Sequence, residues 1–345
     1  MSLRGFSRGN LNDGKDRGKM KFFIRFFITL VVLFLLWSGV VLGQGQRATQ
    51  TSQWVFDVYE KKKAYAQSID EKKIVILSGS NALFGINSKM LEDAFGVKVV
   101  NYGVNAGVLL PYMLYKSKEI IKPKDVVILP LEYHVYTYDG TPNTQMIDTI
   151  FSRDIDFFYA LTPKEQFLTV WNITLERILA GYEAKGGTPV NSGLYGAHNV
   201  DARGDQIGAT AAAKNEYIEK ELDALVPNNY GKIYKKDALT WYYLEEFVSW
   251  CDARDVKVVF MPTTMLFFDV YKKDSKERWF YENIAKEVEA KGWSFVGEPY
   301  EYMYTKEHYF NTDFHLTSEA RNMRTKQMIA DLAASGEIAT AKASQ

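Results

Sequence analysis

Residues 74–88 read IVILSGSNALFGINS, and this stretch decides how the rest of the chain is interpreted. Four apolar β-formers are followed by Ser78-Gly79-Ser80-Asn81 and then by residues that can open a helix. An uninterrupted apolar run of this length predicts a strand buried on both faces. Two interpretations of the polar turn stay open. Ser80 is either a nucleophile at the end of a strand or a cap of the helix that follows.

Similar apolar runs recur along the chain and alternate with helical segments. We expect strands at 73–77, 97–102, 125–131, 256–261 and 293–296, and helices near 54–69, 82–94, 109–120, 146–182, 237–253, 278–291 and 317–334. Buried strands that alternate with helices are typical of a parallel sheet covered on both sides. The sequence therefore predicts an α/β fold of the flavodoxin-like, three-layer kind, a doubly wound parallel sheet spanning residues 70–335. A C-terminal tail, 336–345, follows it.

A long insertion is expected between the third and fourth strands, at about 137–235. It is much longer than a parallel connection requires, and it is rich in aromatic residues with a glycine-rich polar part at 185–208. It is either a helical lid with a surface loop or a surface on which aromatic side chains hold carbohydrate.

The N-terminus predicts a membrane anchor. Residues 26–43, FFITLVVLFLLWSGVVLG, carry no charge and are long enough to cross a bilayer as one helix. Residues 1–25 contain seven Lys or Arg against two Asp, so this basic tail should stay cytoplasmic and the rest should be periplasmic or extracellular. The alternative is a signal peptide cleaved near Gly43. Residues 44–69 are expected to form a short polar spacer and then an amphipathic helix.

Composition excludes several classes of function. Lys and Arg together number 42, as do Asp and Glu, so no basic field suited to nucleic acid is present. The single cysteine, Cys251, excludes an intramolecular disulfide and a cysteine-based zinc cluster. An exported domain is also a poor setting for ATP- or NAD-dependent chemistry. We expect no metal and no cofactor.

Ligands of a doubly wound sheet bind beyond the carboxyl ends of its strands. The residues expected there are Ser78 to Asn81, Asn101 to Gly107, Glu132 to His134, and Asn311 to Thr317 before the last helix. A serine, small residues whose backbone can approach closely, and a histidine with a neighbouring carboxylate are the groups that acyl transfer needs.

These blocks resemble the SGNH, or GDSL-like, hydrolase superfamily over roughly residues 70–335. The resemblance implies that Ser80 is the nucleophile and His315 the general base. It also implies that the Ser80 amide and Gly107, or less favourably Gly103, form the oxyanion hole.

The chain departs from the superfamily in two places. Where the superfamily supplies an asparagine after the third strand, this chain has Glu132, so Asn81 or Asn105 would have to replace that donor. Glu132 and the adjacent Tyr133 become candidates for substrate binding. Glu132 could equally orient a neighbouring Arg or Tyr, or be a satisfied core acid.

The second departure is the spacing of the acid, since Asp313 lies two residues before His315 and Asn311 four before. An Asp-x-His spacing is similar to that of the exported, often membrane-anchored alginate O-acetylation proteins. The resemblance implies that Asp313 orients His315. The alternatives without a catalytic role are that His315 is a structural residue of the turn before the last helix, and that His134 is a polar residue at the edge of the sheet.

The resemblance also implies transfer or removal of acetyl groups on an extracytoplasmic polysaccharide. A transferase of this kind would have a multi-pass membrane O-acyltransferase or a polysaccharide synthase as partner, whereas an esterase would need none. Two alternatives remain. The first is a catalytically silent fold that binds glycan or scaffolds a secretion complex, and the second is an esterase acting on lipid or peptidoglycan.

Overall fold

A five-stranded parallel sheet forms the centre of the domain. In spatial order its strands are β2 (Lys98–Asn101), β1 (Lys73–Ile76), β3 (Val126–Leu129), β4 (Lys257–Phe260) and β6 (Ser294–Phe295). Every neighbouring pair is parallel. The order reverses at β1 and β3, as in doubly wound sheets of the flavodoxin type. The five predicted strands and the α/β class are confirmed. A second, two-stranded sheet of β5 (Met265–Leu266) and β7 (Met303–Tyr304) was not predicted.

The computed structural model describes residues 10–49, 51–183 and 193–339. The first nine residues of the expected basic tail lie outside the described residues. So do residues 185–192 of the glycine-rich stretch and the last six of the expected C-terminal tail.

Two hydrophobic cores, one on each face of the sheet, make the domain a three-layer structure. Alternate residues of β1 point into different cores: Val75 belongs to the larger core and Ile74 and Ile76 to the smaller one. The central strands β1 and β3 are buried on both faces, as their unbroken apolar sequence predicts.

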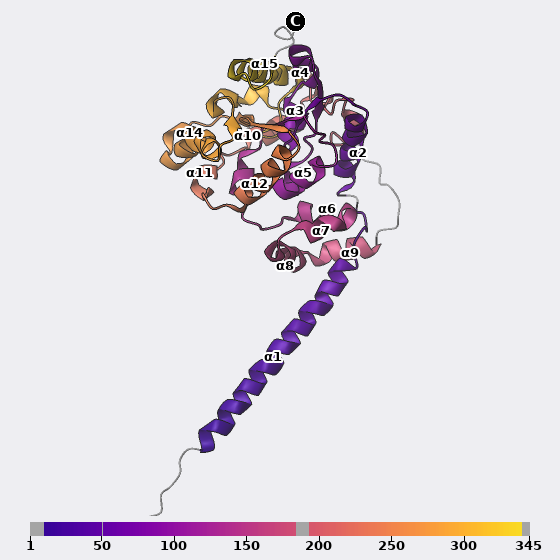
Figure 1. Cartoon of the computed structure of the whole chain (residues 1–345), viewed down its shortest axis with the longest axis vertical. Coiled ribbons are helices and arrows are strands. Elements are labelled where there is room, and N and C mark those ends of the chain that lie inside the picture. The colour runs from indigo at the N-terminus through magenta and orange to yellow at the C-terminus, as the bar shows by residue number, and fades with distance from the viewer. Residues whose placement is uncertain (1–9, 50, 184–192, 340–345) are drawn as a thin grey trace, which may run out of the picture.

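Helices cover both faces (Figure 1). The larger core is covered by α2 (Gln53–Gln67), α5 (Leu109–Ser117), α12 (Leu239–Asp252) and α14 (Ser275–Glu289). The smaller core is covered by α3 (Ser80–Gly85), α4 (Ser88–Phe95) and α15 (Ser318–Ser335). Short helices complete the connections: α10 (Glu216–Asp223), α11 (Tyr230–Ile233), α13 (Val270–Lys273), and the 3-10 turns at Ala106–Val108, Tyr133–Thr137, Ala197–Asn199, Ala211–Ala213, Pro299–Tyr302 and Lys306–His308.

Two expected helices are interrupted. The segment expected at 82–94 is divided into α3 and α4 because Asn87 is extended and its side-chain oxygen accepts from the Met90 amide, capping α4. The segment expected at 146–182 is four helices: α6 (Thr144–Arg153), α7 (Ile155–Ala160), α8 (Pro163–Asn172) and α9 (Leu175–Glu183). Thr162 and Glu165 form a capping box that starts α8 at Pro163.

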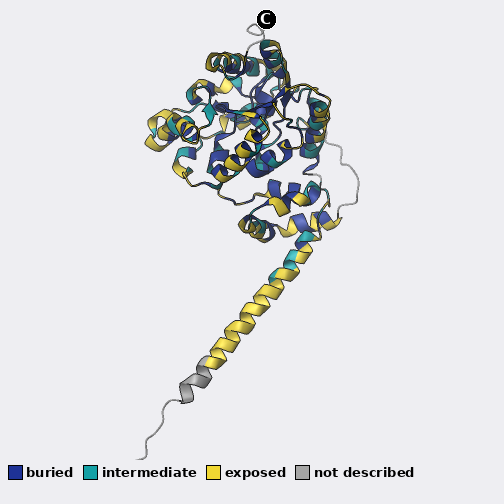
Figure 2. Ribbon diagram, viewed as in Figure 1, coloured by how far each residue is buried: buried dark blue, intermediate teal, exposed yellow. Residues whose placement is uncertain are grey.

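Helix α1 (Asn10–Leu42) leaves the domain as a single rod (Figure 1). Its segment Arg17–Leu42 is long and apolar enough to span a membrane. Most of its surface is exposed and only its last turns contact the domain (Figure 2). Among the described residues, the apolar side chains of this helix before Phe34 are exposed, as those of a membrane-spanning helix would be in the absence of lipid.

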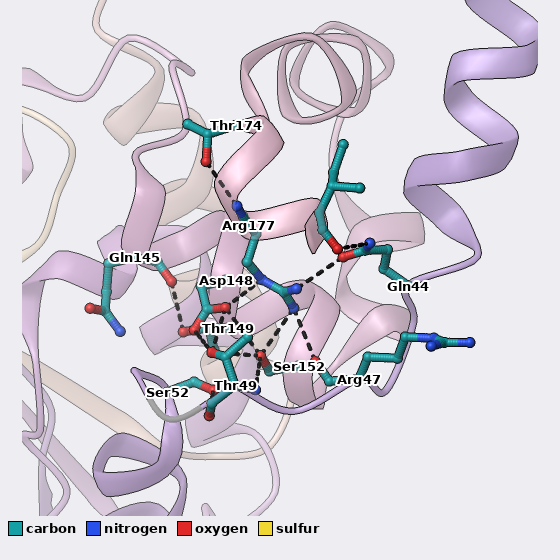
Figure 3. Close-up of polar contacts among 11 residues, drawn as sticks. Gln44, Arg47, Thr49, Ser52, Gln145, Asp148, Thr149, Ser152, Thr174 and Arg177 are labelled. Atoms are coloured by element: carbon teal, nitrogen blue, oxygen red, sulfur yellow. Dashed lines mark hydrogen bonds and ion pairs between the residues drawn. The ribbon is translucent and has the colours of Figure 1, made fainter. Parts of the chain in front are cut away.

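The chain after α1 is docked on the domain, although the sequence predicts a spacer there (Figure 3). Arg177 of α9 donates to the Gln44 side chain (3.0 Å) and to the Arg47 carbonyl oxygen (3.2 Å). The same guanidinium pairs with Asp148 of α6, which also accepts from the Thr49 hydroxyl at 2.8 Å. The chain that follows α1, up to Thr49, is thus bound to α6 and α9 and does not form a free spacer.

Candidate active site

The turn that carries Ser80 is held by a buried carboxylate. Glu132, which follows β3, accepts hydrogen bonds from the Ser78 hydroxyl (2.9 Å) and from the amides of Gly79 and Asn81 (both 3.0 Å). Its side chain is almost completely buried. Of the alternatives that the sequence left open, Glu132 is a satisfied core acid that fixes the strand-to-helix turn.

Asn81 does not face the pocket. Its side-chain amide donates to the Ser78 hydroxyl (2.6 Å) and to the Pro130 carbonyl (3.0 Å), and its oxygen accepts from Arg324 (2.9 Å). Arg324 of α15 is fully buried and also donates to the Asn81 carbonyl at 3.0 Å. The expectation that Asn81 stabilises an oxyanion is therefore wrong, because both ends of its amide are used to hold the turn.

Gly79 allows two loops to approach closely. A Cβ at this position would lie 2.4 Å from the Ala106 Cβ and 2.5 Å from a Glu132 carboxylate oxygen. Gly103 plays the same part in the facing loop, since its Cβ would lie 2.6 Å from the Gly79 carbonyl oxygen. Both glycines are needed because backbone and short side chains occupy the space that a larger residue would enter.

Replacing Gly79 with alanine should therefore destabilise the fold. We expect a loss of about 2 kcal/mol, the usual size of an overpacking effect, visible as a lower thermal unfolding midpoint of the full chain in detergent. Gly193→Ala is the control, because no atom of the described residues lies within 4 Å of its Cβ position. Equal midpoints for the two variants would contradict the close approach.

His315 is oriented by Asn311. The Nδ1 atom of His315 lies 2.8 Å from the Asn311 side-chain oxygen, and the Asn311 amide donates to the Tyr195 hydroxyl at 2.9 Å. With the amide in this orientation, Nδ1 carries the proton and Nε2 is left as the basic nitrogen. Tyr195 comes from the insertion, so the insertion contributes to the site.

Asp313 does not meet His315, contrary to expectation. Its carboxylate accepts from the Asn228 side chain at 2.6 Å, and its carbonyl oxygen accepts from the Leu266 amide at 2.8 Å. The turn before α15 thus directs Asp313 toward β5 and the loop before α11. The partner of His315 lies four residues before it, where the sequence has Asn311.

The His315 ring is buried and stacked on Phe84, with ring centroids 4.0 Å apart and planes 5° apart. Burial lowers the pKa of His315 to about 3. Asn311 is neutral and gives the imidazolium no compensating charge. His315 is consequently an unprotonated base throughout the physiological pH range.

Ser80 and His315 line one pocket of about 260 Å³, together with Trp54, Asn105 and Tyr195. Within the described residues, no hydrogen bond joins Ser80 to His315, and the Ser80 hydroxyl and amide have no partner. A free hydroxyl and a neutral imidazole therefore belong to the lining of one pocket.

Of the expected oxyanion donors, the two glycine amides are not available. The Gly107 amide donates to the Asn105 side-chain oxygen (2.7 Å) and the Gly103 amide to the Asn101 side-chain oxygen (3.1 Å). Both expected glycine donors are thus occupied. The Asn105 side-chain NH₂ has no partner among the described residues and belongs to the pocket lining, so it and the Ser80 amide are the available donors.

The other candidates after β3 do not line this pocket. Tyr133 is buried in an aromatic cluster with Phe280 and Tyr281, at ring distances of 5.8 and 5.0 Å. His134 packs beside Phe314, at 6.3 Å, and burial lowers its pKa. Neither residue lines the pocket with Ser80.

Sequence reasoning missed Trp54, Tyr195, Asn311 and Arg324. Only Asn311 had a local signal, because it precedes His315 by four residues in the block that contained the expected acid. Comparisons with protein-family models, with curated proteins and with solved structures yield no match to this chain. Among the described residues, no cluster of three or more His, Cys, Asp or Glu side chains has the arrangement of a metal site.

Proposed function

We propose that the protein is a membrane-anchored, SGNH-like esterase or O-acyltransferase that uses Ser80, His315 and Asn311 to move a small acyl group, most simply acetyl. One observation carries the proposal: a serine with a free hydroxyl and amide shares a pocket with a histidine whose Nδ1 is held by a hydrogen bond. Nucleophile, base and orienting group are the three parts of this mechanism.

The proposed reaction begins with attack of the Ser80 Oγ on the acyl carbonyl carbon while the His315 Nε2 takes the hydroxyl proton. The Ser80 amide and the Asn105 NH₂ stabilise the oxyanion. Collapse breaks the bond to the donor oxygen, which receives the proton from Nε2, and leaves an acyl-Ser80 ester. Water or a sugar hydroxyl then attacks that ester and gives its proton to Nε2, and Ser80 recovers this proton as it leaves. Ser80 must reach Nε2 directly or through one water in the substrate complex.

One feature favours an extracytoplasmic glycan as acceptor or substrate, and a second favours a partner in the membrane. Trp54 and Tyr195 lie at the pocket with ring centroids 5.2 Å apart, and aromatic faces of this kind can stack on sugar rings. The loop that carries Asn105 and Gly107 also contacts α6, one of the two helices to which the chain after α1 is bound. A Cβ at Gly107 would lie 3.3 Å from Gln145 of α6, the helix whose Asp148 pairs with Arg177 (Figure 3). This short path supports a donor or partner within the membrane, such as a multi-pass acyltransferase or a polysaccharide synthase.

Trapping of the acyl-enzyme tests the proposal. The purified full chain would be mixed with p-nitrophenyl acetate, quenched with acid and digested, and the peptide containing Ser80 examined by mass spectrometry. We expect one acetyl group on Ser80 and none after Ser80→Ala. Adding an oligosaccharide acceptor before quenching separates the two activities, because a transferase acetylates the sugar whereas an esterase releases acetate.

The second candidate function is a catalytically silent fold that binds glycan in the same pocket. The observation that favours it is the weakness of the base. The pKa of His315 is lowered to about 3 and its partner is a neutral amide, whereas proton transfer near neutral pH is best served by a pKa close to 7. A chain that binds oligosaccharide but forms no acetyl-Ser80 would support this function instead.

The low pKa of His315 gives the enzyme proposal a distinctive pH profile. A base must be unprotonated to act. Burial lowers the pKa of His315 to about 3, so the imidazole stays unprotonated at every pH well above that value. We expect kcat/KM for p-nitrophenyl acetate to stay nearly constant from pH 8 to pH 5. Product formation would be measured at the isosbestic wavelength of p-nitrophenol, so that its own ionisation does not affect the signal. An ordinary histidine of pKa about 6.5 would lose roughly thirtyfold over the same range.

Asn311→Asp is the matched variant for this profile. A carboxylate at this position would stabilise the imidazolium and raise the pKa of His315, so the acidic limb should move toward higher pH. A wild-type limb near pH 6.5, or an unchanged limb in the variant, would contradict the buried, Asn311-held base.

A further inference from the structure

A stripe of apolar side chains covers the outer surface of α8 and α9. Its members are each between 48% and 65% exposed, and they follow one another at intervals of four, four, four and three residues: Phe167, Trp171, Leu175, Leu179 and Tyr182. This spacing places Phe167 and Trp171 on one face of α8, and the other three on one face of α9, because helical periodicity holds within each helix but not across the extended Ile173 between them. Five large apolar side chains exposed together are uncommon on the surface of a soluble protein and mark a surface that meets something apolar.

The stripe is continuous with the membrane anchor. Phe34 of α1 lies against Phe167 with ring centroids 5.2 Å apart, and the Trp37 indole donates to the Val170 carbonyl oxygen at 2.9 Å. At the other end, the Tyr182 hydroxyl donates to the Val40 carbonyl oxygen at 3.3 Å. Figure 1 shows α8 and α9 at the end of the domain from which α1 emerges, and Figure 2 shows exposed residues on both helices.

The length of α1 places these contacts inside a bilayer. A hydrocarbon core of about 30 Å needs about 20 residues of helix at 1.5 Å each. Arg25 is the last charged residue before the apolar run, and its long side chain can reach back to the headgroups from inside the core. The membrane-spanning segment can therefore begin about one helical turn before Arg25. About 20 residues later, the upper end of the hydrocarbon core lies near Val41. Phe34 and Trp37 then lie roughly 6 to 10 Å below that end. Helix α8, which they touch, must reach the same depth.

We propose that α8 and α9 form an amphipathic platform that lies in the bilayer leaflet on the domain side, next to α1. The depth obtained from α1 matches the roughly 5 to 10 Å to which interfacial helices bury their apolar faces. Trp171, Tyr182 and Trp37 are residues of the type found at the membrane interface, and the Arg47 guanidinium lies 4.7 Å above the Tyr182 ring, where it can meet lipid headgroups. The platform fixes the domain against the membrane in one orientation, and it rests on α1 being a retained membrane helix, not on the catalytic proposal.

Depth-dependent fluorescence quenching tests the platform with the full chain. Burial raises the pKa of Cys251 to about 12, so its thiol stays protonated and a new cysteine is labelled selectively. Leu175→Cys and Leu179→Cys would be labelled with an environment-sensitive fluorophore in detergent. They would then be reconstituted into vesicles of phosphatidylethanolamine and phosphatidylglycerol with or without brominated acyl chains. We expect brominated lipid to remove roughly half of the emission at both positions, because the labels lie at the level of the upper acyl chains.

Tyr217→Cys is the matched control. Tyr217 is 70% exposed, as open as the platform residues, but it belongs to α10, away from the helices beside α1 (Figure 1). Its label should be insensitive to brominated lipid and fully quenched by aqueous iodide. If the labels at 175 and 179 are quenched by iodide as strongly as the control and are unaffected by bromine, the platform does not enter the bilayer and the proposal is wrong. The wild-type chain carried through the same labelling gives the background from Cys251.

Discussion

Alanine in place of Ser80 is expected to lower kcat for acetyl ester hydrolysis at least about 10³-fold, since removal of the nucleophile of a serine–histidine pair leaves only the oxyanion donors and binding. Stability should be unaffected, because the Ser80 hydroxyl has no partner among the described residues. His315→Ala should cause a loss of similar size, and the double variant should be no worse than either single variant, because the two residues act as a unit. Rates for p-nitrophenyl acetate and thermal unfolding midpoints measure both properties on the same preparation.

Two serines serve as controls for this experiment. Ser68→Ala, at the end of α2 remote from Trp54, should retain both activity and stability. Ser78→Ala should instead lose stability, because the Ser78 hydroxyl donates to the buried Glu132 and to the Pro130 carbonyl oxygen at 2.7 Å. Hydrolysis at equal rates in the wild type, Ser80→Ala and His315→Ala would reject the enzyme proposal and leave the glycan-binding fold.

The strands and the strand-to-helix turn could be predicted because they depend on local patterns. Each strand is an unbroken run of Val and Ile between turn residues, and parallel strands of this kind gather their carboxyl ends on one edge. That geometry brings Ser80 and Asn105 to one pocket with His315. The helix boundaries in the insertion were less predictable, because one capping box and several short turns divide a region whose periodicity looks continuous.

The partners within the site could not be predicted from spacing. Asp313 and Asn311 are both close enough in sequence to meet His315, and a resemblance favoured the acid. Tertiary contacts decide which of the two meets His315. The Asn228 side chain donates a hydrogen bond to the Asp313 carboxylate, and the Asn311 amide donates one to the Tyr195 hydroxyl. Both come from the long insertion, far away in sequence. The role of Glu132 was equally hidden, since its donors lie about fifty residues earlier.

Glutamine in place of Glu132 should cost about 3 kcal/mol of folding free energy, the size expected when buried donors lose a charged acceptor. The carboxylate accepts from the Ser78 hydroxyl and from two amides at 2.9 to 3.0 Å, and a glutamine would turn an NH₂ group toward some of these donors. Glu132 is also the carboxylate whose charge acts on Arg324, a fully buried cation whose pKa is lowered by burial. The variant would remove this carboxylate charge from the surroundings of the Arg324 cation. Urea unfolding of the full chain in detergent measures the loss.

Glu245→Gln is the control for the loss of a carboxylate. Glu245 pairs with Lys291 on the surface, with about half of its side chain exposed, so its change should cost less than about 1 kcal/mol.

The coupling to Arg324 can be isolated with Arg324→Met. If the charge pair matters, Glu132→Gln combined with Arg324→Met should lose clearly less than the sum of the single variants, because the second change removes the cation on which the Glu132 charge acts. Additive losses would mean that Glu132 acts only through its three hydrogen bonds. A loss no larger than that of Glu245→Gln would mean that the turn carrying Ser80 is held by the Asn81 contacts alone.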